Sequence, residues 1–387
     1  MSTPPPLSLS LDATAVPAQP VGAGRYTVEL VDALARRDDV AVTLWARRDD
    51  GARWESASRR VRAVAPSRRP LRLAWEQGRL PWLLSHAAPA VDVHHGPHYT
   101  MPERARLPQV VTIHDLTFLD HPEWHQRSKV PVFRRAIKVA ARRATALVCV
   151  SRVTAARLEE LCRPAGRLFV VPHGVDHERF VARAPSPDHD AAAVSGLGVR
   201  PPYVLFLGTL EPRKAVPELV VAFDRLASSH PALSLVLAGG PGWGTTEIDR
   251  AVATSPYRAR IVRTGYVPDD AVPALLREAA VVAYPALEEG FGLPALEAMA
   301  CGAPLVTTAG TAMAEAAAGA ALLVAPGAVA ELAEAIEGAL DGGPGSEERR
   351  RLGIEAAARH TWAASAAGHV EAYRWALGPG GAPGPAR

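Results

Sequence analysis

The amino-acid sequence predicts an α/β protein with two doubly wound domains, each built on a mostly parallel sheet. Two observations carry this prediction. Short apolar segments alternate with amphipathic segments along the chain, and 387 residues are more than one small core requires. A composition of 48% apolar and 21% charged residues excludes a disordered or fibrous chain.

The predicted strands are short and rich in β-branched residues, and their apolar residues are continuous rather than alternating. This pattern is typical of strands buried on both faces of a parallel sheet. Strands are expected at 41–45, 109–113, 146–150, 168–171, 203–207, 234–238, 261–263, 280–284 and 304–307. Helical periodicity occurs between them, for example at 24–37, 131–144, 152–161, 217–229 and 293–300.

A segment without periodicity occupies the middle of the chain. Residues 183–202 are rich in Pro, Gly, Ser and Asp, which is typical of a linker. We therefore predict a first domain over 1–185, a linker over 186–201, a second domain over 202–370 and a tail over 371–387 with a disordered end. Two Rossmann-like domains of this kind would face a cleft at the carboxyl ends of their strands, where such folds bind ligands.

Composition also bears on location and partners. The apolar stretches are too short or too interrupted to span a membrane, the first residues lack a basic signal region, and the three cysteines suit a reducing compartment. We therefore expect a cytoplasmic protein. Residues 1–190 carry 28 Lys and Arg against 20 Asp and Glu, a net +8, whereas 191–387 carry 15 against 20, a net −5. The basic half indicates an anionic partner or membrane surface.

The segment 203–214 (YVLFLGTLEPRK) combines a buried strand with a basic loop. Gly208 at the end of the strand permits close backbone approach, and Arg213 with Lys214 precedes a predicted helix. Two cations beside a helix start suit a diphosphate, and a solvated Arg-Lys pair on a loop is the alternative.

The segment 284–301 (YPALEEGFGLPALEAMAC) places a glycine-rich turn between two carboxylates, Glu289 and Glu297. The first carboxylate can meet sugar hydroxyls, the turn and the helix start can hold phosphate, and the second can accept from a ribose. The spacing of the two Glu residues means little alone, and the glycine-rich turn between them makes a binding site the better interpretation.

Eight motifs occur together in one order: GAGRYTVELVDAL at 22–34, HGPHYTMP at 95–102, TIHDL at 112–116, VSRVTAARL at 150–158, VPHGVD at 171–176, GTLEPRK at 208–214, TGYVPDDAVPALL at 264–276 and EGFGLPALEAMACGAPLV at 289–306. Any one of them is a weak signal, and the ordered combination is specific. In this combination the chain resembles the family 4 glycosyltransferases of the GT-B fold, which include many bacterial mannosyl- and glucosyltransferases.

The resemblance implies roles for individual residues. Arg213 and Lys214 would hold the donor diphosphate, Glu289 would contact the transferred sugar, and Glu297 would contact the ribose. The remaining donor contacts implied are Gly22, Gly24, Gly208, Tyr266, Val267, Gly290, Phe291, Gly292 and Leu293, with Tyr266 and Val267 bordering the base. His114 would lie close to the reacting sugar.

His114 also follows the predicted strand 109–113, so it is expected at a carboxyl end, where it can donate to a sugar hydroxyl or align an acceptor. A structural histidine paired with Asp115 is the alternative. We predict His114, Glu289, Arg213 and Lys214 as the catalytic residues.

The implied activity is retaining, metal-independent hexosyl transfer, with mannose from GDP-mannose as the first choice of donor sugar. The nucleotide sugar is a co-substrate, and no further cofactor is expected. The acceptor would be a saccharide, a lipid-linked molecule or another anionic molecule in cell-envelope or polysaccharide biosynthesis, and nucleic acid is not expected as a partner. A UDP-glucose-type transferase, another GT-B enzyme such as an epimerase or phosphorylase, and a sugar-binding protein without turnover are the alternatives.

Several features depart from the family pattern or compete with it. Ala215, His173 and the segment around Glu315 differ from the residues common in the family. A cluster of histidines (His94, His95, His98, His114, His121 and His125) has no spacing of a known metal motif, and a D-x-D at 188–190 lies in the predicted linker. We therefore expect no metal site. Dinucleotide and Walker phosphate motifs are absent from the sequence.

One helix carries a basic face. On 131–144, four cations share one side of the helical wheel: Arg134, Arg135, Lys138 and Arg142. A solvated face is the ordinary interpretation, and peripheral contact with an anionic lipid at the inner face of the plasma membrane, or with an anionic acceptor, is the alternative.

Overall fold

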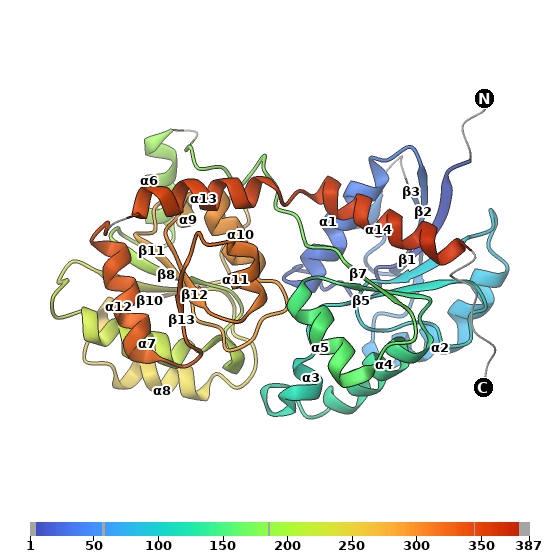
Figure 1. The fold of residues 1–387 in the computed structure, drawn as a ribbon, viewed down its shortest axis with the longest axis horizontal. Helices are drawn as coiled ribbons and strands as arrows, with labels where there is room; N and C mark the ends of the chain where they lie inside the picture. Colours follow the sequence, from blue (N-terminus) through green and yellow to red (C-terminus); the bar gives the residue numbers. More distant parts are fainter. Residues whose placement is uncertain (1–4, 56–58, 185, 344, 379–387) are drawn as a thin grey trace. The chain divides into compact units, whose positions relative to one another are not determined.

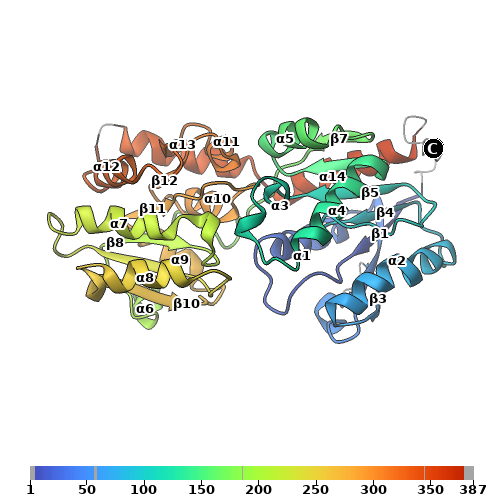
Figure 2. The same cartoon turned by 90° about the horizontal axis from the view of Figure 1, so that it is seen from below.

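The computed structural model describes residues 5–55, 59–184, 186–343 and 345–378, and it confirms the α/β class (Figure 1). The chain forms two compact units. The first contains residues up to 120, residues 127–174 and the segment from 362 onward, and the second contains 121–126 and 175–361. Each unit has its own parallel sheet, flanked by helices (Figure 2).

The first unit has a seven-stranded sheet in the order β3-β2-β1-β4-β5-β6-β7. Its strands are β1 (Leu7–Asp12), β2 (Val40–Arg47), β3 (Arg59–Ala65), β4 (Val93–Gly96), β5 (Gln109–Ile113), β6 (Ala146–Cys149) and β7 (Arg167–Val170). Its helices are α1 (Ala23–Ala35), α2 (Arg69–Ser85), α3 (Thr117–Asp120), α4 (Val130–Arg143), α5 (Arg152–Cys162) and α14 (Trp362–Leu377), with a short 3-10 helix at Ala52–Trp54. Because β1 pairs with both β2 and β4, the strand order reverses between β1 and β4.

The second unit has a six-stranded sheet in the order β10-β9-β8-β11-β12-β13. Its strands are β8 (Tyr203–Leu207), β9 (Ser234–Ala238), β10 (Ile261–Gly265), β11 (Val281–Tyr284), β12 (Leu305–Thr308) and β13 (Leu322–Val324). Its helices are α6 (Pro187–Gly196), α7 (Val216–Leu226), α8 (Thr246–Thr254), α9 (Val272–Arg277), α10 (Leu293–Ala300), α11 (Ala312–Ala317), α12 (Val329–Leu340) and α13 (Ser346–Ala358). Three short 3-10 helices lie at Pro122–Trp124, Pro212–Lys214 and Arg258–Arg260. Here the order reverses between β8 and β11, so each sheet has the Rossmann-like arrangement that was predicted.

Burial explains why the central strands form where the sequence places them. Val204, Leu205 and Phe206 of β8 are fully buried, as a strand covered on both faces must be. β1 alternates Leu with Ser and was not recognised from the sequence. Its Ser10 is nevertheless buried, and the Ser10 hydroxyl bonds to Trp45 Nε1 (2.7 Å) and His94 Nδ1 (2.9 Å). Ser10 can therefore occupy a buried position, because its hydroxyl has two hydrogen-bond partners.

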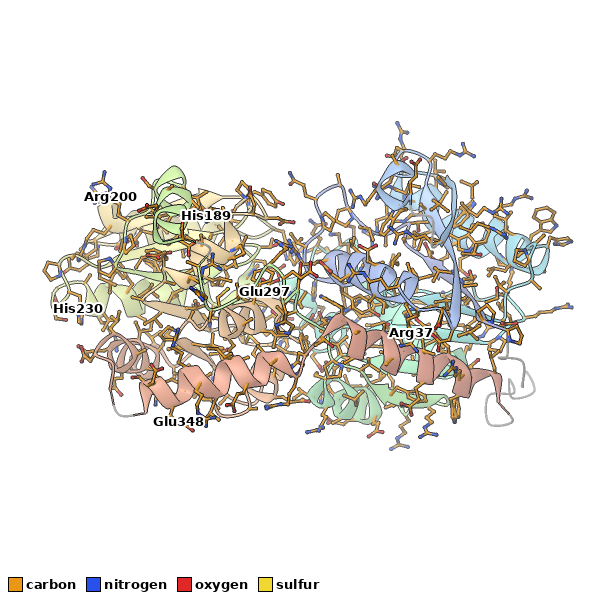
Figure 3. All side chains as sticks on the ribbon, turned by 90° about the horizontal axis from the view of Figure 1, so that it is seen from above. Arg37, His189, Arg200, His230, Glu297 and Glu348 are labelled. Carbon is orange, nitrogen blue, oxygen red and sulfur yellow. The ribbon has the colours of Figure 1, made fainter. Side chains whose placement is uncertain are left out.

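The predicted linker over 186–201 is wrong, because most of it is helix α6. The Ser186 hydroxyl accepts from the amide of His189 (3.2 Å) and caps the helix, beside which Figure 3 labels His189. Asp190 is fully buried and pairs with Arg277 of α9 (2.6 Å). The D-x-D at 188–190 thus belongs to a helix held by an ion pair within the second unit.

The predicted boundary at 370 is also wrong, because α14 belongs to the first unit. It packs beside α1, where Figure 1 shows it in red, and against β4, β5, β6 and β7. His369 Nε2 bonds to the Tyr26 hydroxyl and the Tyr373 hydroxyl to His95 Nδ1, both at 2.8 Å. These contacts connect positions far apart in the sequence, so local composition did not reveal them. The predicted disordered end lies outside the described residues from 379 on.

Candidate functional site

The strongest candidate site lies at the strand-order reversal of the second sheet, beyond the carboxyl ends of β8 and β11. The loop after β8 carries Gly208, Arg213 and Lys214, and the loop after β11 carries Glu289. In open α/β sheets this position is where ligands bind. The backbones of Gly208 and Gly239 pack closely in this site, because a Cβ on Gly239 would lie 2.1 Å from the carbonyl oxygen of Gly208.

Four charged side chains form one cluster in this site. Lys214 Nζ donates to the Tyr284 hydroxyl at 2.6 Å and to the Glu289 carboxylate. Arg213 contacts Glu289 through Nη1 at 3.0 Å and Glu211 through Nη2 at 2.8 Å. The structure therefore brings together Arg213, Lys214 and Glu289, three of the residues predicted for the site.

The buried charges in the cluster stabilise one another. Burial alone would raise the pKa of Glu289, but the charges of Arg213 and Lys214 outweigh burial and bring that pKa to about 2. Burial and the Arg213 charge lower the pKa of Lys214, and Glu289 opposes this shift. The two cations are thus held in place by carboxylates before any anion arrives, which preorganises them for a ligand with negative charge.

The glycine-rich turn leads directly into helix α10. Gly292 has a φ of 89°, and a Cβ there would lie 2.4 Å from Met313 Cγ, so the turn requires glycine at this position. Phe291 and Leu293 are buried on either side of it, and Gly290 begins the turn. Glu297, one turn into α10 and labelled in Figure 3, is 7% exposed.

Two further predicted donor residues follow β10, at the edge of the same sheet. Tyr266 is 43% exposed, and its hydroxyl lies 3.4 Å from an Asp269 carboxylate oxygen. Val267 is buried. An exposed aromatic ring next to a buried aliphatic residue is a surface on which a planar base can stack.

The remaining predicted residues, Gly22, Gly24 and His114, belong to the first unit. Gly22 caps α1 with a φ of 49°, and a Cβ on Gly24 would lie 2.9 Å from Pro17 Cδ. His114 follows β5, is 8% exposed and hydrogen-bonds through Nε2 to the Pro97 carbonyl at 2.8 Å.

His114 is kept neutral by burial, and one of its ring nitrogens is already hydrogen-bonded. A carbonyl only accepts, so Nε2 carries the proton and Nδ1 keeps a lone pair. Burial lowers the pKa of His114, and the Pro97 carbonyl and Asp115 only partly oppose this. Neutral His114 can therefore accept a hydrogen bond from a hydroxyl at Nδ1.

Most of the other histidines of the first half belong to a hydrogen-bonded and aromatic network. In it, His95 bonds to Thr112 and Tyr373, and His173 packs on Tyr26 at 4.6 Å. Among the residues that the structure describes, no three His, Cys, Asp or Glu side chains are placed to hold a metal ion. No helix of this described part is long and apolar enough to cross a membrane.

Two of the four cations on the basic face of α4 make contacts within the protein. Arg134 donates to the carbonyls of Phe118 and Leu119, each at 3.0 Å, and Arg135 pairs with Glu103. These contacts favour a structural role for that part of the face over lipid contact.

Two residues of the site were missed by the sequence analysis, Glu211 and Tyr284. Glu211 stands in the EPRK motif itself, so an acidic residue beside two cations was an available signal. Tyr284 ends a buried strand, so its sequence context predicts a core residue. Its hydroxyl lies beside Lys214 only in the folded chain.

The chain is similar to known proteins over most of its length. Residues 20–179 match the model "Glycosyltransferase Family 4", and residues 189–359 match "Glycosyl transferases group 1". The chain is 28% identical to O-antigen chain mannosyltransferase B of Escherichia coli, over 73% of this chain and 74% of the relative. It is 33% identical to a D-inositol 3-phosphate glycosyltransferase of Nocardia farcinica, over 71% of this chain and 63% of the relative.

The fold also matches a solved structure. Sucrose-phosphate synthase from Thermosynechococcus elongatus superposes with a TM-score of 0.78 at 21% identity, over 95% of this chain and 98% of that one. The two family matches together span most of both units, and the fold matches that of the solved synthase. The chain therefore belongs to the family 4 type of GT-B glycosyltransferases.

Proposed function

We propose that the chain transfers a hexose from a nucleotide sugar to an acceptor hydroxyl, with retention at the anomeric carbon and without a metal. The observation that carries this proposal is the cluster of Arg213, Lys214 and Glu289 at the reversal point of the second sheet. GDP-mannose is the first choice of donor, supported by the likeness to the E. coli mannosyltransferase. UDP-glucose is the alternative.

The chemistry follows from where charge develops. As the bond from the anomeric carbon to the diphosphate breaks, its electron pair goes to the departing diphosphate and negative charge gathers there. The acceptor oxygen bonds to the anomeric carbon, and its proton passes to an oxygen of the departing diphosphate. Arg213 and Lys214 would stabilise this charge without a proton transfer, because Arg213 is cationic at all relevant pH values and the Glu289 carboxylate favours the charged form of Lys214. Glu289 would orient hydroxyls of the transferred sugar, and His114 Nδ1 would accept from a hydroxyl near the reacting carbon.

The acceptor is proposed as a saccharide, a lipid-linked molecule or another anionic molecule. The relative from Nocardia farcinica is named for an inositol phosphate, which is one example of an anionic acceptor. The net +8 of residues 1–190 supports the same class.

Donor binding and turnover test the proposal separately. A thermal-shift screen across GDP-, UDP-, ADP- and dTDP-sugars should identify one nucleotide that raises the melting temperature. At a ligand concentration of 100 times Kd, the free energy of unfolding should rise by about 2.7 kcal/mol. Transfer with that donor should fall by about 10²-fold or more in Arg213→Ala and in Lys214→Ala.

Arg250→Ala is the matched control, because Arg250 is an exposed arginine of the same unit, on α8. Its transfer rate should equal that of the unchanged protein. Near-normal transfer in both site variants would overturn the assignment of the diphosphate cluster. Donor binding without any turnover would instead support a sugar-binding protein.

A further inference from the structure

The first sheet also has a strand-order reversal, and a second group of cations lies near it. The reversal falls between β1 and β4, so the loops that follow these two strands border it. His98 lies in the loop after β4, and α2 begins with Arg69 just after β3. None of these residues takes part in the donor cluster of the second unit.

The ring of Phe133, in the first turn of α4, brings two of these residues together. The Arg69 guanidinium carbon lies 5.3 Å from the Phe133 ring centroid, and the His98 ring lies 5.5 Å from it. Arg72 follows Arg69 by one helical turn and donates from Nη1 to the Thr14 carbonyl at 2.9 Å. The starts of α2 and α4 therefore meet next to the loop after β4, and Arg69 and Arg72 lie at this junction.

His98 lies in a cationic environment. Burial is the main cause that lowers the pKa of His98 to about 3, and His114, Arg72, Arg69 and Lys129 lower it further. His98 Nδ1 is buried and has no hydrogen-bond partner among the described residues. Arg69 is half-buried, and within the same residues it makes no ion pair. Half-buried cations without a counter-charge are costly unless an anion binds.

The acidic groups that act on Arg72 do not form an ion pair with it. Asp12 and Glu76 influence Arg72 but lie outside ion-pair distance of it, and Asp12 accepts from the Thr14 amide at 2.8 Å. Burial, and then the charge of Asp12, raises the pKa of Glu76 to about 8. Glu76 is therefore mostly protonated at neutral pH and contributes little negative charge.

We propose that Arg69, Arg72 and His98 form a subsite for a phosphate group carried by the acceptor. This inference rests on the proposed transferase function, because it assigns the acceptor's chemical class. Arg69 presents a planar fork of donors that matches phosphate oxygens, and Arg72 adds the guanidinium donors that the Thr14 carbonyl does not occupy. The neutral His98 ring, protonated at Nδ1, would donate a hydrogen bond to a phosphate oxygen. The phosphate belongs to a soluble sugar or cyclitol phosphate, or to a lipid headgroup.

Direct binding of inorganic phosphate tests the subsite without any knowledge of the acceptor. Isothermal titration calorimetry is run with the nucleoside diphosphate of the donor present in excess, so that the cations of the second unit are occupied. Phosphate affinity should fall by about 10- to 100-fold in Arg69→Gln, the loss expected for a charged hydrogen-bonding partner. Arg69→Lys should recover part of the affinity, because it restores the charge without the planar fork.

Arg79→Gln is the matched control. Arg79 lies on the same helix and packs over Trp82 at 3.9 Å, so this change removes equal charge from another part of α2. Phosphate affinity should be unchanged in this variant, and nucleotide binding should be unchanged in all three. Equal phosphate affinity in Arg69→Gln and Arg79→Gln would overturn the subsite.

Transfer assays then separate the two sources of phosphate. Hexose and inositol monophosphates are compared with their unphosphorylated forms, and phosphatidylcholine vesicles are compared with and without phosphatidylinositol. A preference for either phosphorylated acceptor that Arg69→Gln abolishes supports the subsite and identifies its source. Equal transfer to phosphorylated and neutral acceptors would contradict it. If no acceptor is glycosylated, the transferase proposal fails, and phosphate titration still decides whether the subsite exists.

Discussion

Single buried charges determine how the donor cluster responds to pH. Glu289 has a pKa of about 2 in the folded chain, below its usual 4.5, because the attraction of Arg213 and Lys214 exceeds the effect of burial. A lowered pKa of a carboxylate stabilises the folded state above the usual value, and this stabilisation is lost as pH falls toward the folded value. The relevant window is therefore about pH 4.5 down to about pH 2.

We predict that Glu289→Gln abolishes this part of the pH dependence. Across the window the unchanged protein should lose about 3 kcal/mol more unfolding free energy than Glu289→Gln does. Denaturant unfolding at a series of pH values, followed by a probe in the second unit, measures the difference. At neutral pH the variant should be the less stable of the two, because Lys214 is left buried with a weaker partner. Parallel pH curves for the two proteins would contradict the prediction.

The role of His114 is a second prediction at the scale of the residue. Replacing His114 with Ala should lower transfer by about 10²- to 10⁴-fold, because the Nδ1 acceptor is lost, while donor binding stays the same. His86→Ala is the control, since it removes an exposed histidine of the same unit. Circular dichroism checks the fold. Unchanged transfer in His114→Ala would contradict this role and favour the alternative, a structural histidine paired with Asp115.

At the scale of elements, the sequence predicted best where a segment's own pattern decides its structure. The bounds of β5, β8, β9 and α10 agree with the predicted 109–113, 203–207, 234–238 and 293–300. β1 and β3 were missed because their apolar residues alternate, and α6 was mistaken for a linker because it lies in the stretch 183–202, which is rich in Pro, Gly, Ser and Asp. Tertiary contacts, such as the Arg277 pair of Asp190, stabilise a helix that composition alone disfavours.

The turn before α10 gives a prediction at this scale. Gly292→Ala should destabilise the second unit and weaken donor binding, because the change adds both a strained φ and a clash with Met313. Gly319→Ala is the matched control, since Gly319 has the same φ of 89° but no atom within 4 Å of its would-be Cβ. Thermal melts and donor titrations of both variants measure the two effects. Equal losses in the two variants would show that backbone strain alone accounts for the change.

At the scale of the whole chain, the two units differ in their buried histidines. The first unit buries His94, His95, His114, His173 and His369, and it also contains the half-buried His98. The division of the chain itself could not be predicted locally, because α14 joins the first unit through long-range contacts of His369 and Tyr373. The dense histidines of the amino-terminal half were visible in the sequence, but their burial was not.

This burial predicts that the first unit unfolds at mild acid pH before the second. Burial lowers the pKa of His94 and His98 to about 3 and of His369 to about 4, from a usual 6.5. A lowered pKa of a histidine stabilises the folded state above 6.5, and the stabilisation is lost as pH falls below that value. At about pH 5 each such histidine lowers the free energy of unfolding by about 2 kcal/mol. Three of them together approach the whole unfolding free energy of a typical domain.

Hydrogen exchange followed by mass spectrometry, corrected for intrinsic exchange rates, measures the two units separately. Between pH 7 and about pH 5, peptides from β1, β4, β5 and α14 should lose protection, whereas peptides from β8, β9 and β11 should keep it. His369→Gln should make the loss shallower, because one proton-binding group is removed from the unfolded state. Simultaneous loss of protection in both sheets would mean that the units unfold as one cooperative block, and that the histidines of the first unit do not limit its stability alone.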